Sequence, residues 1–347
     1  MRKVLLASSA LVAAAGVSAA SADVTINVWQ EFGFSSFSDN SSVDRDTMFQ
    51  DGEMTFSFSQ TSDSGLTYSA HVEMEVNNAQ SGTDENSMSL STADMGSITL
   101  GGNDDVSGSF ATYLPGGRNM ATGDDWTATA RMGDGSAVGS GLSASATGAA
   151  YGDSNKVAYR SPNFGGLTFG MSYSITDEAG HGQSGASTAA ATTGDNADTS
   201  MGMRYSTELA GASVSVQAHN IDNGEDGTDK STTDAFGLSV SMNDLSLAVS
   251  RTSVKAGDTT TGTDVDNIGY GVGYAVNDAL SVAVNLVQSE DDVSKDSMDT
   301  TSYSLSYTIA PGLNFAVAMN SYSYDDFADN NQDLDSDELV ASIQANF

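Results

Sequence analysis

The stretch Leu167–Ile175 reads LTFGMSYSI, and every second side chain in it is large and apolar, while those between are Thr, Gly or Ser. Because successive side chains of a β-strand point to opposite faces of the sheet, this alternation indicates a strand with one apolar and one wet face. The same two-residue period recurs in residues 268–276, 280–286 and 303–309. A helical period of three to four residues is not present over any comparable length. The sequence therefore predicts an all-β fold.

The connectors between the predicted strands alternate between short turns and long loops. The seven short connectors carry Gly, Asn or Asp, which tolerate turn geometry, and the eight long ones are polar and acidic. The short connectors are 61–65, 93–96, 163–166, 210–211, 242–244, 277–278 and 310–312. The long connectors lie at about 35–46, 78–85, 103–155, 176–198, 221–231, 255–265, 290–298 and 323–334. Sixteen strands with connectors sorted in this way are typical of a transmembrane, antiparallel, up-and-down β-barrel of an outer membrane.

Charged residues follow the same two-residue period. A Lys or Arg on the lipid face costs about 2–4 kcal/mol at the bilayer midplane, so a barrel should keep its charges in the lumen or near its rims. Charged residues that alternate with apolar or small ones are therefore expected on the lumen wall: Asp51, Glu53, Glu73, Glu75, Lys156, Arg160 and Arg204. The exceptions fall at strand ends next to long loops: Asp234, Arg251, Asp264, Asp299 and Asp337.

The composition excludes several classes of partner and chemistry. The chain has 12 Lys and Arg against 46 Asp and Glu, for a formal net charge of -34, and it has no Cys. Binding to a nucleic-acid backbone needs clustered basic residues, so a nucleic-acid partner is not expected. The absence of Cys rules out disulfides and thiolate chemistry.

The first 22 residues have the pattern of a cleaved signal peptide. Arg2 and Lys3 precede an apolar stretch that runs to about residue 20, and Ala20-Ser21-Ala22 forms a small-residue cleavage site. An N-terminal membrane anchor is the alternative, but the stretch is short for a span of about 20 residues. We expect an exported protein whose residues 23–347 form the barrel.

Several segments of this chain resemble the general porins of Gram-negative bacteria, especially the alphaproteobacterial type. The resemblance covers nearly all of the sequence after the signal peptide and rests on the strand at 24–34, the segments 61–68 and 96–102, the run KVAYRSPNFGGL at 156–167, and the C-terminal Phe347. It implies a homotrimer in the outer membrane, in contact with lipid and lipopolysaccharide. It also implies that the barrel-assembly machinery reads Phe347 as its assembly signal.

The porin resemblance further implies that the third long connector, at about 103–155, folds into the lumen as a constriction. This connector carries Asp104, Asp105, Asp124, Asp125 and Asp134 together with Arg118 and Arg131. Family members usually face the loop with a cluster of arginines on the opposite wall. This sequence departs from that pattern, because its basic residues in lumen phase are few: Lys156, Arg160 and Arg204, with Arg45 near a rim.

Catalytic and metal-binding motifs give little support for other functions. His71, His181 and His219 are far apart in the sequence, and we expect them to be solvated and the protein not to be an enzyme. The acidic runs 222–229 and 325–338 offer the oxygen ligands that Ca²⁺ prefers, but neither has the spacing of a dedicated calcium loop. No cofactor is required by this interpretation, and calcium in the acidic loops stays an open alternative.

The sequence thus predicts an outer-membrane porin with a water-filled channel for passive diffusion of ions and small hydrophilic solutes, weakly preferring cations. A substrate-specific outer-membrane channel is one alternative, which would need a track of aromatic or basic residues in the lumen. An acidic secreted or surface-layer β-protein is another, which would need neither Phe347 nor sorted loops.

Overall fold

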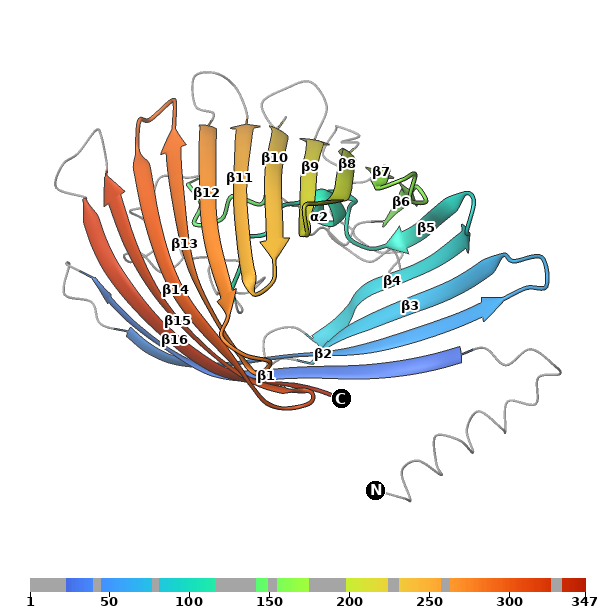
Figure 1. Cartoon of the computed structure of the whole chain (residues 1–347), viewed down its shortest axis with the longest axis horizontal. Helices are drawn as coiled ribbons and strands as arrows, with labels where there is room; N and C mark the ends of the chain where they lie inside the picture. The colour runs from blue at the N-terminus through green and yellow to red at the C-terminus, as the bar shows by residue number, and fades with distance from the viewer. Residues whose placement is uncertain are drawn as a thin grey trace, which may run out of the picture.

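A computed structural model describes residues 23–39, 45–76, 81–116, 142–148, 155–174, 198–223, 231–256, 263–325 and 333–347. The described residues form one closed barrel of sixteen antiparallel strands in which each strand pairs with its neighbours in the sequence (Figure 1). The strands are β1 (Asp23–Asp39), β2 (Arg45–Thr61), β3 (Thr67–Val76), β4 (Ser81–Thr92), β5 (Gly96–Gly102), β6 (Asn155–Arg160), β7 (Leu167–Ser174), β8 (Asp198–Leu209), β9 (Ala212–Asn223), β10 (Ser231–Met242), β11 (Leu245–Ala256), β12 (Thr263–Ala275), β13 (Leu280–Asp291), β14 (Ser297–Ala310), β15 (Leu313–Asp325) and β16 (Leu334–Asn346). The predicted all-β fold and strand number are confirmed.

The barrel closes where β1 meets β16. Their antiparallel register runs from Trp29 opposite Asn346 to Asp39 opposite Ser336. Closure pairs the first strand with the last, so the sheet has no exposed edge, which is the condition for a sheet to cross a lipid bilayer.

The two faces of the barrel differ as the two-residue period predicts. In β7, Phe169, Met171 and Tyr173 are exposed on the outside, whereas Gly170 and Ser172 are buried on the inside. The outer face is therefore apolar over the middle of the strands.

Polar residues on the outer face lie near the long connectors and contact one another. Arg251 forms an ion pair with Asp266 at 3.0 Å, and Lys255 forms one with Asp264 at 3.6 Å. Asp234 and Asp299 accept hydrogen bonds from Asn220 at 2.9 Å and from Gln288 at 3.2 Å. These charged side chains of the outer face therefore form ion pairs or hydrogen bonds with amides near the strand ends, outside the apolar belt of the barrel.

The first long connector is shorter than the predicted 35–46. Strand β1 continues to Asp39 and β2 begins at Arg45, and the two strands stay in register up to Phe37 opposite Arg45. The backbone ladder therefore extends past the point where the alternation of side chains becomes weak in the sequence.

The third connector contains the short helix α2 (Ser107–Phe110), which lies against β8 and β9 inside the ring of strands (Figure 1). Over the described part of the chain, no helix has the length and apolarity needed to cross a membrane.

Candidate functional site

The described parts of the third connector, residues 103–116 and 142–148, lie within the barrel. Phe110 packs so closely on Gly170 of β7 and Gly202 of β8 that a Cβ atom at Gly202 would collide with its ring. Thr112 occupies the corresponding space over Gly237 of β10 in the same way. The predicted inward path of this loop is confirmed for these segments.

Glycines also line the wall beneath the next residues of the loop. In β12, a Cβ atom at Gly269 would lie 3.1 Å from Leu114, and one at Gly273 would lie 2.7 Å from Pro115. These lumen-facing glycines form a bed in which the loop rests against the backbone of the sheet. We name this surface the glycine bed and define it as Gly170, Gly202, Gly237, Gly269, Gly271 and Gly273.

Three basic residues predicted on the lumen wall hold the first half of the loop. Lys156 is buried and its Nζ donates a hydrogen bond to the Asn103 carbonyl at 2.6 Å. Arg204 donates to the Ser109 carbonyl at 2.6 Å, and Arg160 donates to the Ser109 hydroxyl at 3.0 Å. Their placement inside the barrel agrees with the predicted phase, and these hydrogen bonds direct them to the loop.

Polar side chains of the wall also hold the second half of the loop. The hydroxyls of Ser250 and Thr252 both donate to the Ala146 carbonyl at 2.8 Å. His219 is buried, and its Nε2 lies 2.9 Å from the Gly148 carbonyl. His219 is therefore a loop contact, which differs from the solvated side chain that we expected.

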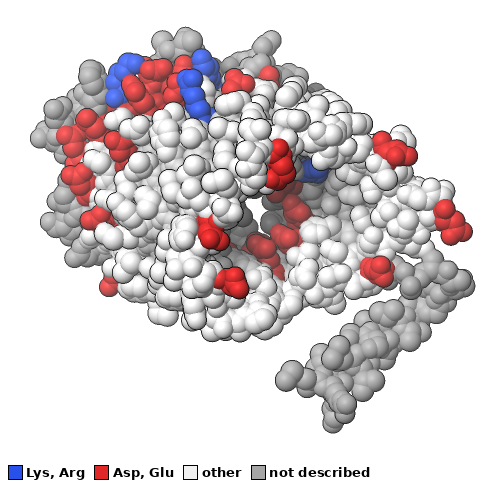
Figure 2. Space-filling model, viewed as in Figure 1, with Lys and Arg blue, Asp and Glu red and all other residues white. Residues whose placement is uncertain are grey.

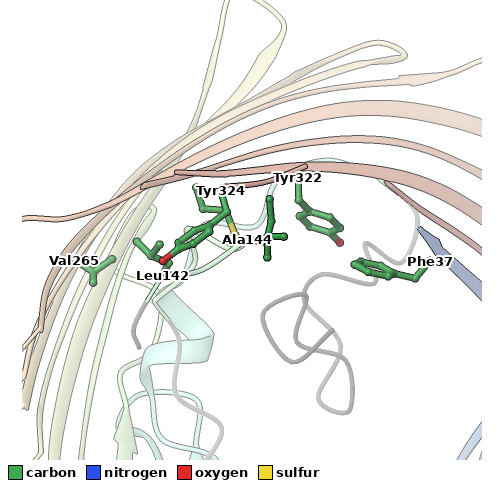
Figure 3. Packing of buried hydrophobic residues seen from close by; sticks show 8 residues of the cluster. Phe37, Leu142, Ala144, Val265, Tyr322 and Tyr324 are labelled. Carbon is green, nitrogen blue, oxygen red and sulfur yellow. The ribbon is translucent and has the colours of Figure 1, made fainter. Parts of the chain in front are cut away.

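An apolar cluster completes the support of the loop. Leu142 and Ala144 pack among Tyr322, Tyr324 and Val265 on the inner face of the barrel (Figure 3). Such side chains exclude water from their contacts, so this part of the inner wall is dry.

The acidic residues predicted on the lumen wall lie on a different arc of the sheet. Asp51 and Glu53 of β2 and Glu73 and Glu75 of β3 are all half-buried. Figure 2 shows a hollow in the molecule with Asp and Glu side chains around and inside it. A negative wall of this kind concentrates cations and repels anions.

Two further carboxylates lie near the seam of the barrel and were not predicted on the lumen wall, although Glu338 ends one of the acidic runs. Glu338 of β16 is buried and accepts hydrogen bonds from Ser35 at 2.9 Å and from Tyr322 at 3.1 Å. Glu31 of β1 is buried and accepts one from Gln344 at 2.9 Å. Their phase, opposite to the outward Phe32 and Leu339, was the signal that could have identified them.

Of the residues of the predicted constriction, the structure describes Asp104 and Asp105. Asp105 is buried at the start of the loop, where its carboxylate accepts the Ser107 N–H at 2.6 Å. The neighbouring Asp104 is half-buried, and its N–H donates to Glu85 of β4 at 3.1 Å. The remaining predicted constriction residues lie outside the described part of the chain: Arg118, Asp124, Asp125, Arg131 and Asp134.

Some other predicted positions also fall outside the described residues. These are the signal peptide at 1–22, His181, and most of the two acidic runs proposed as calcium ligands, at 224–229 and 326–332.

His71 of β3 lies in a polar cluster that the sequence did not reveal. Its Nε2 is 3.4 Å from a Glu85 carboxylate oxygen and 3.7 Å from one of Glu73, and its Nδ1 is 3.4 Å from the Ser57 hydroxyl. The expectation of a merely solvated His71 is therefore wrong.

Comparison with known proteins places this geometry in a family context. The model of the Gram-negative porin family matches residues 7–327. No match is found among curated proteins.

Solved structures resemble the whole barrel at low sequence identity. An anion-selective porin from Comamonas acidovorans has a TM-score of 0.65 and 15% identity, covering 94% of this chain and 100% of that one. In-vitro folded OmpT of Vibrio cholerae, in its trimer form, has a TM-score of 0.62 and 9% identity, covering 93% and 99%. OmpF of Salmonella typhi in complex with daunomycin has a TM-score of 0.59 and 14% identity, covering 93% and 97%. At these identities the likeness concerns the fold.

Proposed function

Because this chain belongs to the Gram-negative porin family and is an outer-membrane channel for solute diffusion, we propose that its channel passes ions and small hydrophilic solutes with a weak preference for cations. The observation that carries the preference is the separation of charges on the inner wall. Acidic side chains occupy β2 and β3, whereas Lys156, Arg160 and Arg204 donate their hydrogen bonds to the loop or its neighbours.

The expected preference is weak for a physical reason. Carboxylates in a water-filled lumen act through mobile counterions, and the Debye length is about 8 Å at physiological ionic strength. A solute that travels farther than this from the acidic wall is largely screened from it. Small neutral solutes should therefore pass along with cations.

The Comamonas acidovorans porin is described as anion-selective, and that property belongs to that protein. At 15% identity, shared architecture does not fix the charge of the inner wall. The acidic residues of this chain support the opposite preference.

The direct test is the zero-current potential of the purified protein in a planar bilayer across a potassium chloride gradient. We expect the sign that corresponds to cation preference. A triple variant, Asp51→Asn with Glu53→Gln and Glu75→Gln, should lower that potential. A control with Asp234→Asn and Asp299→Asn neutralises acids of the outer face and should leave it unchanged. An anion-preferring sign in the unaltered protein would refute the proposal.

We also propose that the chain is exported by cleavage after Ala22 and assembles as a homotrimer in contact with outer-membrane lipid and lipopolysaccharide. Mass spectrometry of the protein from outer membranes should give an N-terminus at Asp23. Conductance should rise in groups of three steps as single trimers insert. Single, independent steps would argue for a monomer.

Calcium in the acidic runs 222–229 and 325–338 remains a separate prediction, and the diffusion channel needs no cofactor. Elemental analysis of protein that was purified without chelator would detect bound calcium.

A further inference from the structure

Three side chains with metal-binding groups meet on the lumen wall where β3 lies beside β4. The Nε2 atom of His71 is 3.4 Å from Glu85 Oε2 and 3.7 Å from Glu73 Oε2. Donor atoms of the three residues all lie within 4.8 Å of one another. The side chains are partly accessible, with exposed fractions of 34% for His71, 20% for Glu73 and 19% for Glu85.

A shift in the strand register produces this meeting. Val72 pairs with Asn86, but Met74 pairs with Thr83, so two residues of β4, at 84 and 85, lie opposite Glu73 alone. A bulge of this kind changes the direction of side chains and is frequent beside functional sites. It brings two carboxylates to the same imidazole.

Each of the three side chains is also held by a group outside the cluster. The Ser57 hydroxyl lies 3.4 Å from His71 Nδ1, and the Thr55 hydroxyl donates to Glu73 at 3.4 Å. The Asp104 N–H donates to the second oxygen of Glu85 at 3.1 Å. Ligands of protein metal sites are characteristically oriented by such partners, above all through the ring nitrogen of His that does not bind the metal.

The distances agree with the size of a small transition-metal ion. For a tetrahedral ion with bonds of about 2.0–2.1 Å to nitrogen and oxygen, two ligand atoms lie roughly 3.3–3.4 Å apart. The distance from His71 Nε2 to Glu85 Oε2 already has this value, and the distance from His71 Nε2 to Glu73 Oε2 exceeds it by only a few tenths of an ångström. Three protein ligands would leave the fourth position to water.

We propose that His71, Glu73 and Glu85 bind one divalent transition-metal ion of the Zn²⁺ class in the lumen. One imidazole and two carboxylates suit Zn²⁺ better than Mg²⁺, which prefers oxygen ligands alone and keeps several waters. The alternative is an ion-paired cluster, in which a protonated His71 bridges the two glutamates without metal. The metal site and the metal-free cluster involve the same three side chains, and measurements of metal binding distinguish them.

The test is calorimetric titration of the full-length folded protein in detergent with zinc chloride at neutral pH, after removal of metals by chelator. We expect one saturable site that a large excess of Mg²⁺ does not displace. The variants His71→Ala and Glu85→Gln should each raise the dissociation constant for zinc at least about 10-fold, since loss of even an outer-shell partner weakens metal binding about 10–100-fold.

Glu75→Gln is the matched control, because it removes the same charge from the same strand, two residues from Glu73. It should leave the zinc affinity unchanged, since Glu75 is not one of the three proposed ligands. The proposal is wrong if the unaltered protein shows no saturable zinc binding, if Mg²⁺ competes equally, or if Glu75→Gln weakens binding as much as Glu85→Gln.

Glu85→Gln is nearly isosteric and serves where His71→Ala fails to fold, as judged by heat-modifiable mobility. Zinc binding does not depend on an open channel, so its absence would leave the proposed cation preference intact. Conversely, an anion-preferring channel that still has a saturable zinc site would overturn the proposed cation preference and leave the zinc site intact.

Discussion

Phe347 and Val28 are joined across the seam of the barrel by two backbone hydrogen bonds, from Phe347 N–H at 2.9 Å and from Val28 N–H at 3.2 Å. The last residue of the chain therefore takes part in closing the sheet through its backbone. Phe347 as a whole is 77% exposed. The backbone of Phe347 thus contributes to closure, while its side chain is exposed where the proposed assembly signal would be read.

This separation gives a prediction for Phe347→Ala. The substitution keeps the backbone hydrogen bonds, so refolding of the purified protein in detergent should be nearly unchanged. The amount of folded protein in the outer membrane of cells should fall several-fold if the assembly machinery reads the ring. Heat-modifiable electrophoretic mobility measures both quantities.

Phe164→Ala is the control for Phe347→Ala, because Phe164 is a similarly exposed aromatic in a short turn. It should leave the cellular yield unaltered. An equal loss of refolding in detergent for Phe347→Ala would place the effect in stability and contradict recognition.

The glycine bed makes a second prediction at Gly202. Gly202→Ala places a methyl group against Phe110, so the loop must shift away from the wall toward the lumen. Overpacking of this kind costs about 1–3 kcal/mol of unfolding free energy. We expect a lower thermal midpoint and a lower single-channel conductance.

Gly33→Ala is the matched overpacking control, because its methyl group would meet the ring of Phe49 on the opposite arc. It should lower the thermal midpoint and leave the single-channel conductance unchanged, because the loop is not displaced. Equal conductance of Gly202→Ala and the unaltered protein would show that the loop position does not limit the current.

Arg204 gives a third prediction. Arg204→Ala removes the hydrogen bonds to the Ser109 carbonyl and to Gln217, both at 2.6 Å. The partners are left without a charged donor, which costs about 1–3 kcal/mol. We expect a lower unfolding free energy and larger fluctuations of the open-channel current.

Arg251→Ala offers the comparison for Arg204→Ala on the outer face. Arg251 is 64% exposed and forms a surface ion pair with Asp266, and such pairs contribute about 0–1 kcal/mol. Its loss should leave current fluctuations unchanged. Equal fluctuations in both variants would argue against Arg204 as an anchor of the loop.

The acidic wall predicts a dependence of selectivity on ionic strength. Raising the salt from about 0.01 M to about 1 M shortens the Debye length from about 30 Å to about 3 Å. At a fixed ratio across the bilayer, the zero-current potential should therefore fall as the mean concentration rises. The triple variant of Asp51, Glu53 and Glu75 should show a flatter dependence, and a steeper one would place the selective charges elsewhere.

Local periodicity was sufficient to predict the strands and the faces of their side chains. The phase of Asp51, Glu73 and Lys156 follows from alternation with apolar neighbours, which is a property of adjacent residues. The sorting of short and long connectors likewise needs no knowledge of distant contacts. These features were therefore available before the structure.

Contacts between distant segments could not be predicted in this way. The approach of Glu85 to His71 depends on a register shift that alternation does not encode. Glu31 and Glu338 carry the correct phase, but their shared neighbourhood arises only when β1 meets β16. The glycines of β12 are evident in the sequence as small residues. Their role as a support for the loop becomes clear only from the positions of Leu114 and Pro115.

The glycine bed has a consequence for how the calibre of this channel is set. The diameter of a barrel rises with its number of strands, so sixteen strands alone would give the channel one fixed diameter. Because the bed lets a connector lie directly on the backbone, the free aperture also depends on how thick that connector is. Aperture and strand number are thereby uncoupled, so exchanging the residues on the bed offers a way to resize the passage without rebuilding the sheet.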